Sequence, residues 1–308
     1  MKPFRFGVQV SQCDSGKGWR DKARKLEDLG YSTLFMPDHF GEELAPLPAI
    51  AMAAAHTTTL RIGSLVYDND YKHPAILAKE SATIDLLSDG RLEFGIGAGW
   101  MKTDYDALGL PYDPPAVRVD RFEEALHIIK QCWTGEKFTY AGEHYRVTDY
   151  ASYPKPVQSP PPLLIGGGGK RVLSIAARQA DIVGINPKIV ARSINPESMR
   201  TAAADAVDEK IAWVKEAAGD RFDQLELQMQ VFKTTVTDKP AEVVEQVAGA
   251  FGLPPDVIAT APFFQIGSAE QITENLLQIR ERWGINSILF QPDGIDPMGP
   301  VVAKLAGT

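Results

Sequence analysis

The chain has 308 residues, of which 44% are hydrophobic and 23% charged, and a formal net charge of −8. This is the composition of an ordinary globular protein, and the acidic balance argues against nucleic acid or an anionic membrane surface as the main partner. The N-terminal segment is too short for a signal peptide, no apolar run approaches the ~18 residues of a spanning helix, and Cys13 and Cys132 form neither a disulfide framework nor a zinc pattern. We therefore expect a cytoplasmic protein.

Short apolar strands alternate with helical stretches in the first half of the chain. In chain order, the patterns predict a strand at residues 4–10, a helix at 18–29, a strand at 33–36, a helix at 48–57, a strand at 60–67, a helix from 74 to about 89, a strand at 92–96 and a helix at 117–133. Pro74 suits a first helical turn, and Gly30, Gly90 and Gly135 each follow a last turn.

The same alternation continues in the second half. A small hairpin at 139–145 is followed by a strand at 163–165, a helix from about 169, a strand at 181–184, an excursion at 186–196, a helix at 198–217, a strand at 225–235, a helix at 241–251, a second excursion at 253–266, a helix opened by a capping box at 268–271, and a strand at 287–290.

Eight strands alternating with helices predict the α/β class and a (β/α)8 TIM barrel, with loop insertions at its C-terminal face. A doubly wound open sheet alternates in the same way, but residues 11–18 after the first strand contain no G-x-G-x-x-G turn. The proline-rich stretches at 113–116 and 153–162 are too short to join separate cores. We therefore expect residues 1–308 to form a single domain.

Catalytic groups of such a barrel follow the C-terminal ends of its strands. Asp38 and His39 follow the second strand, where a histidine faces the mouth of the barrel; the alternative is a turn cap with local hydrogen bonds. Residues 97–99 (Gly-Ala-Gly) follow the fourth strand and allow a flat ligand to approach the backbone, or only tight packing. Beyond Trp100, the polar residues at 104–106 show no spacing signature, and we do not interpret them as a catalytic pair.

The strongest local signal is the glycine run at residues 166–169, between the fifth strand and a helix. Free backbone N–H groups at a helix N-terminus bind anions, and Lys170 and Arg171 add positive charge. Gly167, Gly168 and Gly169 therefore predict a phosphate site, although neither the dinucleotide nor the Walker pattern is present. The five histidines have no metal-ligand spacing, and no G-x-S-x-G elbow occurs, so we expect redox chemistry carried by a phosphate-bearing cofactor, without a metal.

Several motifs, spread over roughly residues 4–290, occur together in one known family. They are Asp38-His39-Phe40, residues 78–85 and 88–91, residues 95–100, residues 121–126, residues 133–135 and the glycine run at 165–169. In this combination the chain resembles the luciferase-like monooxygenase superfamily, and most of all its coenzyme F420-dependent (5-deazaflavin) oxidoreductase branch. The resemblance implies a (β/α)8 barrel, a homodimer, and either F420 or reduced FMN as cofactor.

The resemblance also assigns roles to individual residues. It implies that Asp38 and His39 lie at the deazaflavin ring, with His39 near the reactive carbon, and that a cis peptide between Leu65 and Val66 backs the ring. It places residues 97–99 (Gly97, Ala98, Gly99) beside the ring and Gly168-Gly169, with Lys170 and Arg171, at the phosphate. The sugar-phosphate dehydrogenases of the branch carry a Trp near position 43 and a Glu at position 100. This chain has Glu43 and Trp100, which argues against a sugar-phosphate substrate and leaves the cofactor assignment unchanged.

We therefore expect hydride transfer between coenzyme F420 and a small organic substrate, with His39 and Asp38 as the catalytic residues. An FMN-dependent monooxygenase on the same barrel is the first alternative. A barrel that binds a phosphorylated ligand without turnover is the second.

Overall fold

Within residues 1–190 and 195–308, which the computed structural model describes, eight parallel strands form a closed barrel. They are β1 (Arg5–Gln9), β2 (Thr33–Met36), β3 (Arg61–Ser64), β5 (Leu92–Gly97), β8 (Leu163–Gly167), β9 (Ile182–Ile185), β10 (Glu226–Gln230) and β13 (Ile285–Phe290). Their order is β3-β2-β1-β13-β10-β9-β8-β5, and the pairing of β3 with β5 closes the ring. The predicted (β/α)8 fold is confirmed.

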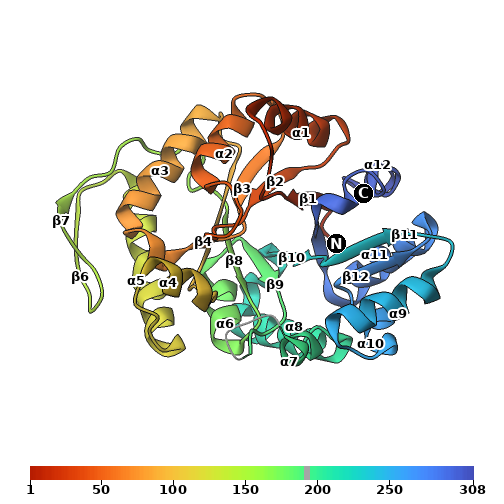
Figure 1. The fold of residues 1–308 in the computed structure, drawn as a ribbon. Helices are drawn as coiled ribbons and strands as arrows, with labels where there is room; N and C mark the ends of the chain where they lie inside the picture. The colour runs from red at the N-terminus through yellow and green to blue at the C-terminus, as the bar shows by residue number, and fades with distance from the viewer. Residues whose placement is uncertain (191–194) are drawn as a thin grey trace.

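Helices surround the strands on the outside of the barrel (Figure 1). Those between barrel strands are α1 (Gly16–Asp28), α2 (Pro46–Ala54), α3 (Pro74–Leu87), α5 (Pro115–Thr134), α6 (Lys170–Gln179), α8 (Ala204–Ala218) and α11 (Ala269–Trp283), and α12 (Gly299–Leu305) follows the last strand. Their ends carry the predicted signals: Pro74 opens α3, Gly135 ends α5 in the left-handed conformation, and Ser268 forms a capping box with Gln271. Among the described residues, no helix is both long and apolar enough to cross a membrane.

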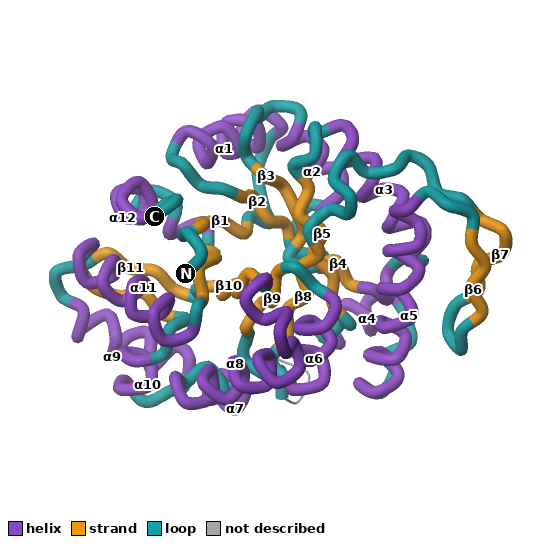
Figure 2. The backbone as a smooth tube through the Cα atoms, turned by 180° about the vertical axis from the view of Figure 1, so that it is seen from behind, coloured by secondary structure: helices purple, strands orange, loops and turns teal. Residues whose placement is uncertain are grey.

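The connecting segments carry additional elements. They are β4 (Tyr67–Asp68), η1 (Asn69–Tyr71), α4 (Lys102–Leu108), the hairpin of β6 (Phe138–Ala141) and β7 (Arg146–Tyr150), α7 (Pro196–Arg200), η2 (Gly219–Gln224), α9 (Pro240–Phe251), α10 (Pro255–Thr260) and η3 (Pro292–Gly294). The β6–β7 hairpin projects from the side of the barrel in both views (Figures 1 and 2). Helix α4 follows the end of β5 and therefore lies at the C-terminal end of the barrel.

The prediction of one continuous strand at residues 225–235 is wrong. Strand β10 ends at Gln230, and the chain leaves the barrel as β11 (Lys233–Val236), which pairs with β12 (Phe264–Gly267). The N–H of Val231 still donates to Leu289 of the barrel, whereas the N–H of Phe232 donates to Phe263. Phe263 belongs to the predicted excursion at 253–266. Strand β11 therefore forms only because residues 233–236 meet this distant segment.

Two further boundaries differ from the prediction. The third strand, predicted at residues 60–67, is interrupted between β3 and β4, and the helix predicted at 198–217 is divided into α7 and α8. Part of the predicted excursion at 186–196, residues 191–194, lies outside the described residues.

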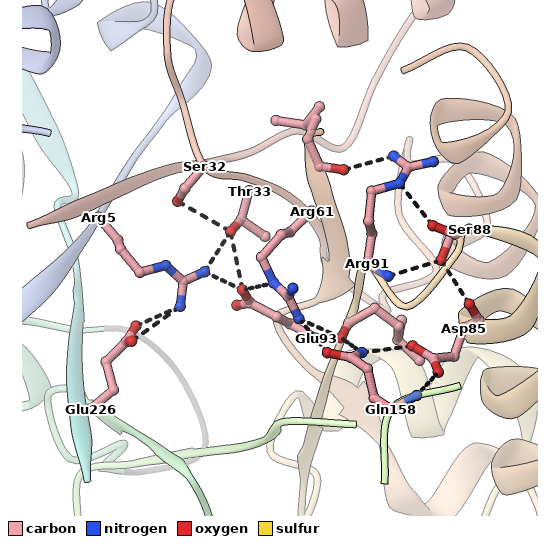
Figure 3. Close-up of polar contacts among 12 residues, drawn as sticks. Arg5, Ser32, Thr33, Arg61, Asp85, Ser88, Arg91, Glu93, Gln158 and Glu226 are labelled. Carbon is pink, nitrogen blue, oxygen red and sulfur yellow. Dashed lines mark hydrogen bonds and ion pairs between the residues drawn. The ribbon is translucent and has the colours of Figure 1, made fainter. Parts of the chain in front are cut away.

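Inward-facing side chains fill the barrel in layers. At the N-terminal ends of the strands, the buried carboxylate of Glu93 accepts hydrogen bonds from Arg5 and Arg61, and Arg5 also contacts Glu226 at 2.9 Å (Figure 3). A buried apolar cluster also fills the barrel, and Leu65 and Val66 pack on it; it consists of Phe35, Leu164, Ile182 and Leu289. One end of the barrel is thus filled, which leaves the C-terminal ends of the strands for a ligand.

Candidate active site

Glutamine side chains at the ends of β1 and β10 line the mouth of the barrel. Gln230 donates to the side chain of Gln9, which in turn donates to the carbonyl oxygen of Leu65 at 2.9 Å. The Leu65–Val66 peptide bond is cis, as the resemblance implied. A Cβ atom on Gly97 would lie only 2.8 Å from the Val66 side chain. The predicted ring-backing segment is therefore held by Gln9 on one side and by the glycine strand β5 on the other.

Asp38 joins two loops of the mouth. It follows β2, and its Oδ2 accepts a hydrogen bond of 3.2 Å from the backbone N–H of Asp68 at the end of β4. Burial raises the pKa of the Asp38 carboxyl. Among the described residues Asp38 makes no hydrogen bond to His39, so its observed contact fixes the backbone of the β2 loop.

His39 contacts a carboxylate that the sequence did not single out. Its Nδ1 lies 2.8 Å from Oδ2 of Asp104, a residue of α4 that is only 5% exposed. The hydroxyl of Tyr71 donates to the same oxygen at 3.2 Å, and the ring of Trp100 meets His39 edge-on, with centroids 5.5 Å apart. Asp104 was set aside because it shows no spacing signature. Its place in the first turn of a helix directly behind the 97–99 loop is the signal that could have identified it.

Glu43 also lies near His39. It belongs to the loop between β2 and α2, and burial raises the pKa of its carboxyl, with the charge of Asp104 adding to this and that of His39 opposing it. Its Oε2 atom is buried and has no hydrogen-bond partner among the described residues. The two predicted substrate residues, Trp100 and Glu43, are thus both brought to His39.

The loop at residues 97–99 is fixed from behind. Gly99 has a φ of +75°, and a Cβ atom there would lie 1.9 Å from the Tyr105 hydroxyl of α4. Arg118 of α5 donates to the carbonyl oxygens of Ala98 and Gly99, each at 3.3 Å. Glycine is therefore required at 99 by the backbone and by packing, and the loop presents its other side to the mouth.

The glycine run divides into two parts with different reasons for lacking side chains. A Cβ atom on Gly168 would lie 2.3 Å from the carbonyl oxygen of Pro187, so this glycine is required by the neighbouring loop. A Cβ atom on Gly169 would meet nothing within 4 Å. Gly169 caps α6, which has no side-chain cap, so its first N–H groups are available to an anion. Residues 167–169 thus fit a phosphate at an open helix N-terminus.

Lys170 and Arg171 are directed to neighbouring helices. Lys170 lies 3.0 Å from Glu216 of α8, and Arg171 contacts Asp120 and Glu123 of α5. Each cation therefore already has carboxylate partners, and the backbone of Gly169 is the better-supported part of the phosphate site. The direct role of the two cations stays a prediction.

The family is identified by the match over most of the chain. The family model described as luciferase-like monooxygenase matches residues 3–252. The chain belongs to this family. The resemblance on which the sequence analysis relied is confirmed.

The names of similar proteins refer to two cofactors, F420 and FMNH(2). An F420-dependent glucose-6-phosphate dehydrogenase of Nakamurella multipartita is 30% identical over 246 residues, which are 77% of this chain and 69% of that protein. One of the same name from Microbacterium testaceum is 29% identical over 74% of this chain and 68% of its own. An FMNH(2)-dependent dimethylsulfone monooxygenase of Pseudomonas putida is 27% identical over 60% of this chain and 64% of its own.

Solved structures support the luciferase-like fold. An F420-dependent secondary alcohol dehydrogenase in complex with an F420-acetone adduct superposes with a TM-score of 0.79 at 20% identity, covering 99% of both chains. The F420-dependent tetrahydromethanopterin reductase of Methanopyrus kandleri gives 0.76 at 18% identity, covering 98% of this chain and 99% of its own. At these identities the likeness establishes the barrel, and the site has to be argued from this chain's residues.

Behind the mouth of this luciferase-like barrel lies an unusual buried acid. Asp68, only 7% exposed, accepts a hydrogen bond of 3.1 Å from Tyr105 and caps η1 through the N–H of Asp70. Arg121 binds the carboxylate of Asp70, not that of Asp68. Burial, together with the nearby charge of Asp70, raises the pKa of Asp68 to about 7.

We expect Asp68→Asn to stabilise the protein at alkaline pH. The folded state holds the Asp68 proton up to about pH 7, whereas an unfolded chain releases it near 3.8, so stability falls as the pH rises between these values. The upper bound is about 4 kcal/mol, because one pKa unit corresponds to about 1.4 kcal/mol. In thermal unfolding, the variant should have a higher melting temperature than the wild type at about pH 8.5. At about pH 4 the two melting temperatures should be nearly equal.

The exposed Asp106 of α4, changed to Asn, is the matched control and should show no such pH-dependent gain. A melting temperature that Asp68→Asn lowers equally at both pH values would contradict the prediction, because Asp68 would then be ionised and favourable in the folded protein.

Proposed function

We propose that this protein is a coenzyme F420-dependent oxidoreductase that transfers a hydride between the deazaflavin and a small organic substrate. The relatives named F420-dependent support this, since two of them match about three quarters of the chain. The observation that carries the proposal is the placement of His39, the cis Leu65–Val66 segment and the open N-terminus of α6 at the same end of one barrel. A deazaflavin has a carbon where a flavin has N5, so it carries a hydride when bound.

The residues of the mouth fit such a group. Residues 167–169 and the free N–H groups of α6 would hold its phosphate, with Lys170 and Arg171 contributing charge only if they leave their present partners. Leu65 and Val66 would back the ring, and residues 97–99 would border it. Orientation by these rigid elements would supply much of the rate, because a hydride passes only between closely aligned atoms.

We assign the remaining roles at the mouth to four side chains. His39 would exchange a proton with the substrate, whereas Asp38 would act through the loop that carries His39. Trp100 and Glu43 would contact the substrate, which we propose is not a sugar phosphate. Glu43 and Asp104 bring two carboxyl groups close to His39, and in their ionised form these would repel a phosphate group there.

The assembly and location are further proposals. We propose a homodimer, which the family resemblance supports, and a single domain formed by residues 1–308. We also propose a cytoplasmic location, which the free thiols Cys13 and Cys132 support. Size-exclusion chromatography with light scattering would test the dimer directly.

A fluorescence titration with F420 and, in parallel, with FMN tests the cofactor. Trp100 lies against His39, so a ring bound at the mouth should quench its emission. We expect saturable quenching by F420 at micromolar concentration, with FMN binding at least about tenfold more weakly, a difference of about 1.4 kcal/mol. The Trp100→Phe variant serves as the control and should lose most of the quenching signal.

The opposite preference would move the protein to the FMN-dependent monooxygenases, for which the dimethylsulfone relative provides a precedent. No response to either cofactor would contradict the proposed function and leave a barrel that binds another phosphorylated ligand.

A further inference from the structure

Asp104 lies on the buried side of the His39 ring. Both residues lie at the mouth, yet they come from loops that follow different strands, β2 and β5. Asp104 is buried, whereas 22% of the His39 side chain remains exposed. The carboxylate therefore lies behind the imidazole and away from the solvent side on which a substrate would bind.

The Asp104 carboxylate can only accept hydrogen bonds while it is ionised. Two groups meet its Oδ2: Nδ1 of His39 at 2.8 Å and the hydroxyl of Tyr71 at 3.2 Å. Burial, together with the charges of nearby carboxylates, raises the pKa of Tyr71, so its hydroxyl keeps its proton and donates. An oxygen that accepts from Tyr71 can accept from His39 as well, which requires the proton of the neutral imidazole to be on Nδ1.

The other ring nitrogen is available for chemistry. Among the described residues, Nε2 of His39 makes no hydrogen bond to the protein, and Trp100 meets the ring edge-on at an interplanar angle of 86°. The ring is thus held by a hydrogen bond at Nδ1 and by an aromatic contact. Nε2 keeps its lone pair and points away from the Asp104 carboxylate, since the two nitrogens lie on opposite sides of the ring.

Helix α4 is anchored so that Asp104 keeps this position. The next residue, Tyr105, is fully buried, and its hydroxyl lies within hydrogen-bonding distance of both Asp68 (3.1 Å) and Asp70 (3.0 Å). These carboxylates belong to β4 and η1, directly after the Leu65–Val66 segment. The helix that carries Asp104 is therefore tied to the strand end that would back the cofactor, so histidine and cofactor positions are set by one rigid assembly.

We propose that Asp104 is the positioning residue of His39: it fixes the Nδ1–H tautomer, with Tyr71 completing its hydrogen bonds, so that Nε2 is the atom that exchanges a proton with the substrate. This rests on the proposed function for its catalytic meaning, but the tautomer is a property of the free protein. Asp104 itself touches neither substrate nor cofactor.

Nitrogen-15 NMR of the histidine rings tests the tautomer without cofactor or substrate. The protein is labelled with ¹⁵N, and the His39 signals are assigned by their absence from His39→Gln. At about pH 9, where an imidazole is ordinarily neutral, we expect Nδ1 to be the protonated nitrogen of His39 and Nε2 the unprotonated one. A wild-type His39 protonated on Nε2 would overturn the proposal.

Variants separate positioning from folding. In Asp104→Ala the Nδ1–H preference should be lost, whereas Asp104→Asn, which keeps an acceptor oxygen, and Tyr71→Phe should retain most of it. Asp106→Ala, an exposed position on the same helix, is the control and should leave the His39 signals unchanged. Should Asp104→Ala fail to fold, Asp104→Leu is measured instead; an unchanged Nδ1–H form in a folded variant of either kind would overturn the proposal.

Separate effects on kcat and KM provide the second test. With F420 and a turned-over substrate, Asp104→Ala should lower kcat by at least about tenfold and change KM by less than about twofold, with partial recovery in Asp104→Asn. An equal loss in F420 affinity and kcat would mean that Asp104 only maintains the fold. If F420 fails to bind the wild type, the proposed function fails, while the NMR result still decides the tautomer.

Discussion

We expect His39→Ala to lower turnover by about 10²- to 10⁴-fold, the range that a positioned proton-transfer group contributes. F420 affinity should change by less than about tenfold, roughly 1.4 kcal/mol, because in the proposed site the backbone of β8 and α6 would provide the phosphate contacts. We expect this asymmetry because the part of His39 that stays exposed, 22% of its side chain, would face the substrate and not the cofactor phosphate. Steady-state kinetics with the best substrate from a panel of small alcohols and carbonyl compounds, together with the fluorescence titration, measure both quantities.

His56→Ala is the matched control for this experiment. His56 lies just beyond the C-terminal end of α2, close to the beginning of β3 and thus at the opposite end of the barrel, where its Nδ1 lies 2.8 Å from the carbonyl oxygen of Met52. It should leave both kcat and F420 affinity within about twofold. Wild-type turnover in His39→Ala would show that His39 takes no part in the reaction. The contact between His39 and Asp104 would then have no catalytic role.

The second large effect is expected at the glycine run. Gly169→Val should weaken F420 binding by about 100-fold, roughly 2.7 kcal/mol, because its side chain would occupy the space in front of the α6 N-terminus. The protein leaves room for the first side-chain atom: a Cβ atom there meets nothing within 4 Å, and Gly169 has an extended backbone (φ −110°, ψ 150°) that valine adopts readily. The loss should therefore come from the ligand alone.

Two comparisons make this result specific. Gly249→Val, in α9, is the control, since a Cβ atom at 249 also meets nothing within 4 Å and α9 lies on the outside of the barrel (Figure 1). Gly168→Val is unsuitable, because its side chain would collide with Pro187 and disturb the β9 loop. Unchanged F420 affinity in a folded Gly169→Val protein would exclude the α6 N-terminus as the phosphate site.

The charges at the mouth suggest how this barrel differs from its sugar-phosphate relatives. His39 lies near the carboxylates of Glu43 and Asp104, and Lys72, which interacts with Asp38, is already paired with Glu80 at 2.8 Å. We expect such a mouth to favour substrates that are neutral or that donate hydrogen bonds. The substrate panel should therefore begin with uncharged alcohols and ketones.

Local sequence determined the architecture of this protein. Periodicity gave helices and strands their places, and Pro74, Gly135 and Gly284 set helix ends, since backbone conformation at such positions depends on the residue itself. Once eight alternating units imply a barrel, strand ends are known to share one face. For this reason Asp38, His39 and the glycine runs could be assigned to the mouth before any contact was seen.

Only the tertiary structure decided which of these residues meet. The partner of His39 is Asp104, 65 positions away, on a short helix with no periodic signal. Lys170 and Arg171, expected at the phosphate, are paired with carboxylates of α8 and α5, and β11 exists because it finds β12. Such contacts depend on the paths that the loops take across the closed barrel. The local conformational preferences of the residues do not determine those paths.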